Sequence, residues 1–348
     1  MNHTGFLPAI AVSLLLLVSG CAAGANSADA ASPTSGATMS VSDAQAFVTD
    51  VQRQRGLPAP APVSSIDELL EVLTTDQMDR FGEGERLVAG KPGVDALTLH
   101  ASLELAWSDD LKTLSLILAE LGKRADAEVR RLSARREAGA KLSDAEQKDL
   151  EQNQKNLDFD SKAQAATEAL AQEHLRAAGL VVAEARRQFP KDPLTYRVLA
   201  YHALLSGEWL AFDGAIEPLK DKEATDPGLV YLRALESLKR FAVRKDAAVL
   251  LRKALQLNPK LLRAQAKLTL VEEGIDAKYA EFEKLKAQAA NHPIVWLAGP
   301  SMTSDYELSA SFRKARAAQQ PGPAVTPAAA APAAPTAPPA AVAPPPAP

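Results

Sequence analysis

Four prolines recur at nearly constant spacing in the C-terminal half of the chain. Pro193, Pro227, Pro259 and Pro293 are separated by 34, 32 and 34 residues. Each follows a stretch of helix-forming composition, and proline cannot continue a helix because it lacks an N–H group. The intervals between these stops are long enough for two helices joined by a turn. The spacing therefore predicts a series of helix pairs, each followed by a proline.

The period and the small residues of one block resemble the tetratricopeptide repeat. The block that runs from Ala247 through Leu251 and Ala254 to Pro259 matches the second helix and the stop of that repeat, and looser copies precede it. The Trp, Gly and Tyr of the usual first helix are missing. In such repeats, stacked helix pairs bury an apolar stripe that one pair alone cannot bury. The resemblance implies a helical-repeat domain over residues 161–316.

Composition supports an all-α fold. Ala and Leu lead the apolar residues, β-branched residues are sparse, and aromatic residues make up only 5% of the chain. This composition favours helices over a sandwich, a barrel or a parallel-sheet enzyme. The segment 97–107 alternates apolar and polar residues as a strand does, but its helix propensity predicts a helix. We expect an all-α chain in which a helical hairpin leads into tetratricopeptide-like antiparallel helix pairs, with disordered termini.

A charged hairpin is predicted within a helical region at residues 64–160. Its first arm carries a run of arginines, Gly139 breaks that arm, and the second arm opens with acidic residues. Ser143 and Glu146 predict a capping box at the start of the second arm. Each exposed ion pair across the hairpin contributes only about 0.2–1 kcal/mol, so we expect such pairs to set the register more than the stability. The alternative for most of these residues is a solvated charged face.

Three further local patterns bear on possible sites. Ser65, with a glutamate three residues later, predicts another capping box. The pair Asp109-Asp110 is expected at the start of a helix, where acidic side chains favour the positive end of the helix dipole. The Gly-x-Gly that begins at Gly82 lacks the third glycine and the preceding strand of a phosphate-binding loop, so no such loop is predicted.

The N-terminus predicts an exported, lipid-anchored protein. Residues 1–20 hold an apolar run that is shorter than the ~20 residues needed to span a bilayer but suits the core of a signal peptide. The sequence VSGC at residues 18–21 resembles the lipobox of bacterial lipoproteins, although the usual basic residues before the run are missing. The resemblance implies that Cys21 is lipidated and that the protein faces the periplasm in the cell envelope. The residue after the cysteine, Ala22, is not acidic, which is similar to lipoproteins that are sorted to the outer membrane. The alternative is an ordinary cleaved signal in which Cys21 is incidental.

Composition shifts divide the rest of the chain. Residues 22–40 are rich in small residues, which is typical of a flexible tether, and the proline-rich stretch 56–62 separates a short helical piece from the rest of the chain. The C-terminal end is rich in Ala and Pro and carries no charge, so it cannot form a packed core. The expected parts are a signal peptide at 1–20, a lipidated tether at 21–63, the helical region at 64–160, the repeat domain at 161–316 and a disordered tail at 317–348.

The residue inventory argues against catalysis, metal binding and nucleic-acid binding. Lys and Arg number 39 against 43 Asp and Glu, so there is no basic excess for nucleic acid. A single cysteine excludes a disulfide framework within one chain and a Cys-rich zinc site. The five histidines include no pair at metal-ligand spacing on one helix, and the Gly-x-Ser-x-Gly elbow of hydrolases is absent from the sequence. We expect no enzyme activity, no metal and no cofactor.

The candidate binding surface is the face presented by the first helix of each repeat. In tetratricopeptide repeats this helix lines a concave groove. Guanidinium groups bind carboxylates in a bidentate fork, so the expected guest is an acidic peptide or a C-terminal carboxylate. The alternative is that these cations only solvate an exposed face. The residues that we expect to bind a partner are Arg197, Tyr201, Arg233, Glu236, Arg263 and Lys267.

Together these patterns predict a lipid-anchored envelope protein whose repeat domain is a scaffold for protein–protein interaction. Its partners would be envelope proteins, its membrane contact would be the lipid on Cys21, and it would not bind nucleic acid. Two other functions stay open. One is an accessory helical-repeat subunit of a solute transport system, which needs an enclosed apolar cavity. The other is a structural spacer whose Ala/Pro tail reaches toward the cell wall.

Overall fold

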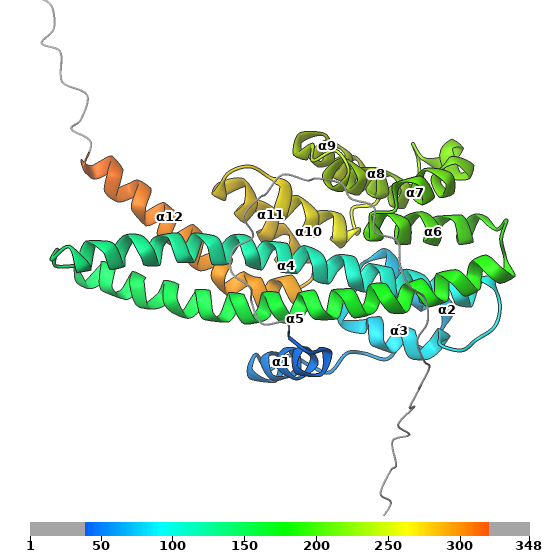
Figure 1. Ribbon diagram of the computed structural model, residues 1–348, viewed down its shortest axis with the longest axis horizontal. Helices are drawn as coiled ribbons and strands as arrows, with labels where there is room; N and C mark the ends of the chain where they lie inside the picture. The colour runs from blue at the N-terminus through cyan, green and yellow to red at the C-terminus, as the bar shows by residue number, and fades with distance from the viewer. Residues whose placement is uncertain (1–38, 320–348) are drawn as a thin grey trace, which may run out of the picture. The chain divides into compact units, whose positions relative to one another are not determined.

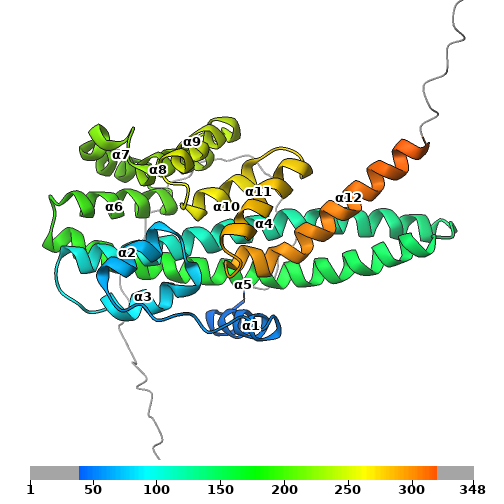
Figure 2. The same ribbon diagram turned by 180° about the vertical axis from the view of Figure 1, so that it is seen from behind.

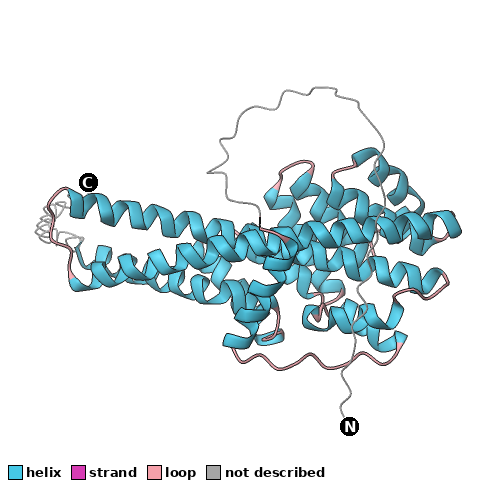
Figure 3. Ribbon diagram, turned by 60° about the horizontal axis from the view of Figure 1, so that its bottom comes forward, coloured by secondary structure: helices cyan, strands magenta, loops and turns pink. Residues whose placement is uncertain are grey.

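The computed structural model describes residues 39–319. These residues form helices and no strand, as Figure 3 shows, which confirms the all-α prediction. The signal peptide, Cys21 and nearly all of the Ala/Pro tail lie outside the described residues. The helices, in chain order, are α1 (Val41–Gln54), α2 (Ile66–Thr74), the short η1 (Met78–Arg80), α3 (Phe81–Val88), α4 (Val94–Glu137), α5 (Asp144–Gln188), α6 (Pro193–Ser206), α7 (Trp209–Ile216), η2 (Glu217–Lys222), α8 (Pro227–Lys239), α9 (Arg244–Leu257), α10 (Leu262–Val271), α11 (Ile275–Gln288), η3 (Ile294–Ala298) and α12 (Gly299–Gln319).

The longest elements, α4 and α5, form a hairpin about which the other helices pack (Figure 1). Gly139 in the turn has φ +82°, a conformation that favours glycine. Ser143 and Glu146 form the predicted capping box at the start of α5. An expected ion pair between the arms forms between Arg135 and Glu146, whereas Arg130 pairs with an acid on its own helix. The local signals of this hairpin were therefore sufficient to predict it.

Three helix pairs follow the hairpin: α6 with α7, α8 with α9, and α10 with α11. Pro193 and Pro227 occupy the first turns of α6 and α8, after the N-caps Asp192 and Asp226. Proline is favoured there because an N–H in the first turn of a helix has no partner within the helix. The predicted period therefore corresponds to one helix pair. Pro193 and Pro227 each begin the first helix of a pair. The pairs lie along one side of the hairpin, and α1 and α3 lie on the other (Figures 1 and 2).

Residues 41–54 fall within the range assigned to the tether, and they form α1, the short helical piece expected before the proline-rich stretch; α1 packs on α5. Ala44 and Val51 are buried in this contact region, and the rings of Phe47 and Phe159 lie 6.0 Å apart. The packed part of the chain therefore begins before residue 64. The expected boundary at residue 160 lies inside α5, because the sequence there has no glycine or proline to end the helix.

The inner face of the helix pairs packs on the long hairpin. Both α6 and α10 contact α4. Ala101 and Leu105 of α4 share one buried apolar cluster with Leu204 of α6, Leu235 of α8 and Leu268 of α10. Burying a leucine side chain contributes about 1.5–3 kcal/mol, so this cluster stabilises the docking of the pairs strongly. The chain's own α4 therefore covers part of the face on which a groove was expected.

Two further apolar clusters complete the core. Leu118 of α4 packs with Phe282 of α11 and Trp296 of η3, where the chain turns into α12. On the other side, Leu69 of α2 and Leu103 of α4 belong to a cluster that holds α2 and α3 against the hairpin. Within residues 39–319, no helix is both long enough and apolar enough to cross a membrane.

Candidate functional site

A cleft of about 610 Å³ opens between α2, α4, the N-terminal halves of α6 and α8 and the start of α10. Its lining is mainly apolar. Ile66 and Leu70 of α2 and Leu194 of α6 line it with 37%, 46% and 41% of their surface exposed. Large apolar side chains grouped in an exposed hollow mark a binding surface, because water is readily displaced from them. The cleft is therefore the candidate binding site of the described residues.

A charged pair also lines the cleft. Arg197 of α6 forms an ion pair with Asp226, the N-cap residue of α8. The Asp226 carboxylate has further partners, because it also accepts hydrogen bonds from the backbone N–H groups of Gly228 at 2.9 Å and Leu229 at 3.2 Å. The Arg197 side chain stays 41% exposed. Its guanidinium can therefore take a second anionic partner from the solvent side.

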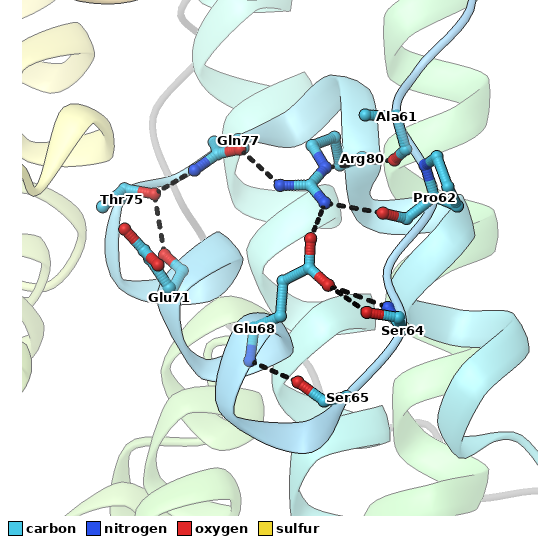
Figure 4. Close-up of polar contacts among 9 residues, drawn as sticks. All are labelled: Ala61, Pro62, Ser64, Ser65, Glu68, Glu71, Thr75, Gln77 and Arg80. Carbon is cyan, nitrogen blue, oxygen red and sulfur yellow. Dashed lines mark hydrogen bonds and ion pairs between the residues drawn. The ribbon is translucent and has the colours of Figure 1, made fainter.

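The α2 wall of the cleft is fixed by Arg80 (Figure 4). Its guanidinium donates to the two carbonyl oxygens of residues 61–62, at 3.1 and 2.7 Å, and pairs with Glu68. The Ser65 hydroxyl caps α2 as predicted, by accepting from the Glu68 N–H at 3.2 Å. The Glu68 carboxylate, however, accepts from the N–H of Ser64 at 2.9 Å, one residue before the expected partner. The Arg80 guanidinium thus holds the start of α2, through Glu68, against residues 61–62.

A buried charge network lies beneath the cleft and centres on Asp109 of α4. The Lys267 ammonium donates to Asp109 Oδ1 at 2.8 Å, the Tyr201 hydroxyl donates to Oδ2 at 3.0 Å, and the Tyr231 hydroxyl donates to Oδ2 as well. Burial opposes ionisation of Asp109, but Lys267 and the more distant Lys239 hold the pKa of its carboxyl below the usual value. Burial and the charge of Asp109 raise the pKa of both tyrosines. The first helices of all three pairs are therefore bonded to one carboxylate.

Arg263 and Asp76 form a second buried ion pair. The Arg263 guanidinium donates to Asp76 Oδ1 at 2.8 Å and to the carbonyl oxygen of Leu73 at 3.2 Å. Burial opposes ionisation of Asp76, but Arg263 lowers the pKa of its carboxyl to about 2. Burial, together with the charge of Asp76, raises the pKa of the neighbouring Asp110 well above its usual value. The pair joins the loop after α2 to the start of α10.

Three of the six residues expected to bind a partner belong to this network. Tyr201 and Arg263 line the cleft but are buried, and Lys267 is only 3% exposed. The expected open basic face of Arg263 and Lys267 is therefore not present. The physical reason is that Asp109 and Asp76 supply the carboxylates that were expected from a guest.

The other expected residues lie in two places. Arg197 lines the cleft, as described above. Arg233 and Glu236 of α8 lie elsewhere and bond to each other at 2.8 Å, while Arg233 also pairs with Glu223 at 2.7 Å and Glu236 with Arg240 at 3.0 Å. These groups satisfy one another, so Arg233 and Glu236 do not extend the cleft.

Asp109 and Asp110 are not at the start of a helix. They lie in the middle of α4, which begins at Val94, and both are buried. One signal in the sequence pointed to this position. Asp109 follows Ala101 and Leu105 at steps of four, so a helix places it on their apolar face. A charge on an apolar stripe needs a buried partner, and the sequence alone did not identify Lys267 as that partner.

Among residues 39–319, two groups of side chains bring metal-ligating atoms together, and one of them lies within this network. In Asp76, Asp110 and His292, three such atoms lie within 4.8 Å of one another. However, His292 Nδ1 accepts the backbone N–H of Ile294 at 3.2 Å. The neutral imidazole then carries its proton on Nε2 and has no lone pair there for a metal. Arg263 already compensates the charge of Asp76, so this group is better described as part of the ion-pair network. The second group lies between α3 and α4.

Comparison with protein-family models, curated proteins and solved structures finds no match for this chain. The fold and the cleft define the class. It is an all-α protein in which three helix pairs close on a long helical hairpin and leave a mainly apolar cleft open beside α2.

Proposed function

We propose that this protein is a lipid-anchored scaffold of the bacterial cell envelope, and that its cleft holds an apolar segment of a partner protein. The observation that carries this proposal is the exposure of Ile66, Leu70 and Leu194 in one hollow of about 610 Å³. These side chains come from α2 and α6, so a single inserted segment can contact both walls. Covering apolar surface contributes about 25 cal/mol per Å², which favours such an insertion.

Arg197 indicates that the segment bound in the cleft carries a negative charge. A guanidinium binds a carboxylate through two parallel hydrogen bonds, and the partly exposed Arg197 lies beside the apolar wall. The first turns of α6 and α8 also direct the positive ends of their helix dipoles toward this region. An apolar segment with an acidic side chain or a C-terminal carboxylate fits these features.

The proposed location rests on the sequence VSGC at residues 18–21. A lipid on Cys21 would hold the binding domain at the membrane surface, because each buried CH₂ group contributes ~0.8 kcal/mol. We place the protein on the periplasmic face of the envelope, at the outer membrane. In this role it binds envelope proteins and the lipid surface, without catalysis, a cofactor or nucleic acid.

The experiment compares co-purification of envelope proteins with three forms of the full-length protein in detergent. The test form carries Leu70→Asp and Leu194→Asp. The control form carries Leu210→Asp on α7, where the leucine is 89% exposed and lies outside the cleft. A partner that wild type and the control retain, and the test form loses, supports the proposal. A partner retained equally by all three forms contradicts it, provided that circular dichroism is the same for each.

The accessory subunit of a solute transport system is the second candidate. A volume of about 610 Å³ lies within the range of small-molecule sites, roughly 300–1,000 Å³. A fluorescent apolar probe separates the two functions. Saturable binding of one probe per purified chain, lost with Leu194→Asp, together with no protein partner, favours the transport role. Retention of a protein partner that blocks probe binding favours the scaffold.

A further inference from the structure

Glu85, His100 and Glu104 bring three metal-ligating atoms together between α3 and α4. His100 Nε2 lies 3.9 Å from Glu85 Oε1 and 3.8 Å from Glu104 Oε1, and the three ligand atoms lie within 4.8 Å of one another. These separations are too long for hydrogen bonds. They are close to the ~3.4 Å that separates two ligand atoms held ~2.1 Å from a tetrahedral ion. The three atoms are therefore close enough to share one ion and do not hydrogen-bond to one another.

The positions of these residues follow from the sequence and from helix packing. His100 and Glu104 are four residues apart on α4, so they share one face of that helix. Glu85 comes from α3, next to Gly84, which allows α3 to approach closely. A Cβ atom at Gly84 would lie 2.5 Å from Leu69 Cδ1 and 3.3 Å from Leu103 Cδ1. The glycine thus lets the Glu85 carboxylate come near His100.

A neighbouring imidazole orients Glu104. His174 of α5 hydrogen-bonds through Nδ1 to Glu104 Oε2 at 2.8 Å, and its ring stacks on Trp107 with the centroids 4.2 Å apart. Metal-ligating carboxylates are commonly held in this way by a second hydrogen-bond partner. The other oxygen of Glu104, Oε1, then faces His100.

The ion-pair partners of Glu104 and Glu85 differ from those of Asp76 and Asp109. The Glu104 side chain is 4% exposed, and among the described residues its ion-pair partners are His100 and His174 only. Glu85 likewise has no lysine or arginine within ion-pair distance in the described part of the chain. Asp76 and Asp109, by contrast, each have a basic side chain. The basic partners of Glu104 are therefore imidazoles, whose neutral form offers a nitrogen lone pair that can ligate a metal ion.

We propose that Glu85, His100 and Glu104 bind one divalent transition-metal ion. An imidazole nitrogen with two carboxylate oxygens is a donor set that suits Zn²⁺ and neighbouring ions, whereas Ca²⁺ and Mg²⁺ prefer oxygen ligands alone. Three protein ligands leave a coordination position for water, and the His100 side chain is 17% exposed. The ion would join α3 to α4 beside α2, whose residues form one wall of the cleft.

The test uses the full-length protein without a histidine tag, stripped with a chelator and titrated with Zn²⁺ by calorimetry. The variants Glu85→Gln and His100→Gln each remove one ligand. Glu83→Gln, two residues away on α3 and paired with Arg86, is the matched control. We expect one Zn²⁺ per chain in wild type and control, and at least tenfold weaker binding in each ligand variant, with Ca²⁺ binding far more weakly than Zn²⁺. The visible absorption of bound Co²⁺ should change with His100→Gln, because the imidazole is lost.

Two results would overturn the proposal. One is a stripped wild-type protein that binds no Zn²⁺ at stoichiometric level. The other is equal affinity in Glu85→Gln, His100→Gln and Glu83→Gln, which would place any bound ion elsewhere. Glu85 is 40% exposed, so its replacement tests the site even if His100→Gln lowers stability.

Discussion

The Lys267 ammonium donates a hydrogen bond of 2.8 Å to the carboxylate of Asp109, a residue 158 positions earlier in the chain. This buried contact joins the third helix pair to the middle of α4. Tyr201 and Tyr231 bring the first two pairs to the same carboxylate. The inner face of the helix pairs thus binds an acidic group of its own chain, and the cleft beside α2 is the part that stays open.

Removing the cation of this contact should destabilise the fold strongly. Lys267→Met leaves the Asp109 charge buried with only hydroxyl partners, and breaking a buried ion pair on one side costs about 3–5 kcal/mol. Denaturant unfolding of the full-length protein measures the change. Arg252→Met, at an exposed ion pair with Glu272, is the control and should cost at most about 1 kcal/mol. Equal effects of the two substitutions would contradict the account, and adding Asp109→Leu to Lys267→Met should restore much of the loss.

The two glycines of α3 should respond in opposite directions to alanine. Gly84→Ala places a Cβ atom against Leu69 and Leu103, both fully buried, and overpacking of this kind costs about 1–3 kcal/mol. At Gly82 the nearest atom, in Trp107, is 3.5 Å away, an ordinary contact. Gly82→Ala should therefore stabilise the protein by about 0.5–1 kcal/mol through helix propensity. Thermal unfolding of both variants checks the prediction, which fails if Gly84→Ala is neutral.

Asp160 should make stability depend on pH. Its Oδ1 accepts from the Ser301 hydroxyl at 2.8 Å, its Oδ2 has no hydrogen-bond partner in the described part of the chain, and burial raises the pKa of the carboxyl to about 7. The folded state therefore binds more protons than the unfolded state between about pH 4 and pH 7, so this residue makes stability fall as pH rises through that window. Asp160→Asn should be more stable than wild type above pH 7, by on the order of 1–4 kcal/mol, with the difference vanishing near pH 4.

Unfolding midpoints measured from pH 4 to pH 8 test this prediction. Asp158→Asn, at an exposed position two residues away on α5, is the control and should follow wild type at every pH. A constant difference between Asp160→Asn and wild type across the range would show that Asp160 ionises as an ordinary carboxyl.

The helices could be predicted because their signals are local. Ser143 caps α5 through a residue three positions away, and Pro193 acts on the first turn of its own helix. The buried face of α10 could not be predicted in this way. Arg263 and Lys267 are four residues apart, which is typical of a solvated basic face, and only contacts with α2 and α4 bury them.

The candidate site was predictable to a smaller degree. Tyr201 and Arg197 were expected at a groove and do line the cleft, but its apolar walls were missed because Leu70 and Leu194 come from opposite halves of the chain. The spacing between histidines alone does not reveal the group around His100, because its neighbour at four residues is a glutamate. The spacing of four residues between His100 and Glu104 is the signal in the sequence for this group.

Photocrosslinking from inside the cleft tests the central claim most directly. A photoreactive amino acid replaces Leu70 in the full-length protein in its native envelope, and Leu210 is replaced in a parallel sample. The account predicts a discrete covalent adduct with a partner protein from position 70, none from position 210, and loss of the adduct when Leu194→Asp is added. Equal adducts from both positions, or none from position 70, would contradict the claim that the cleft holds a partner.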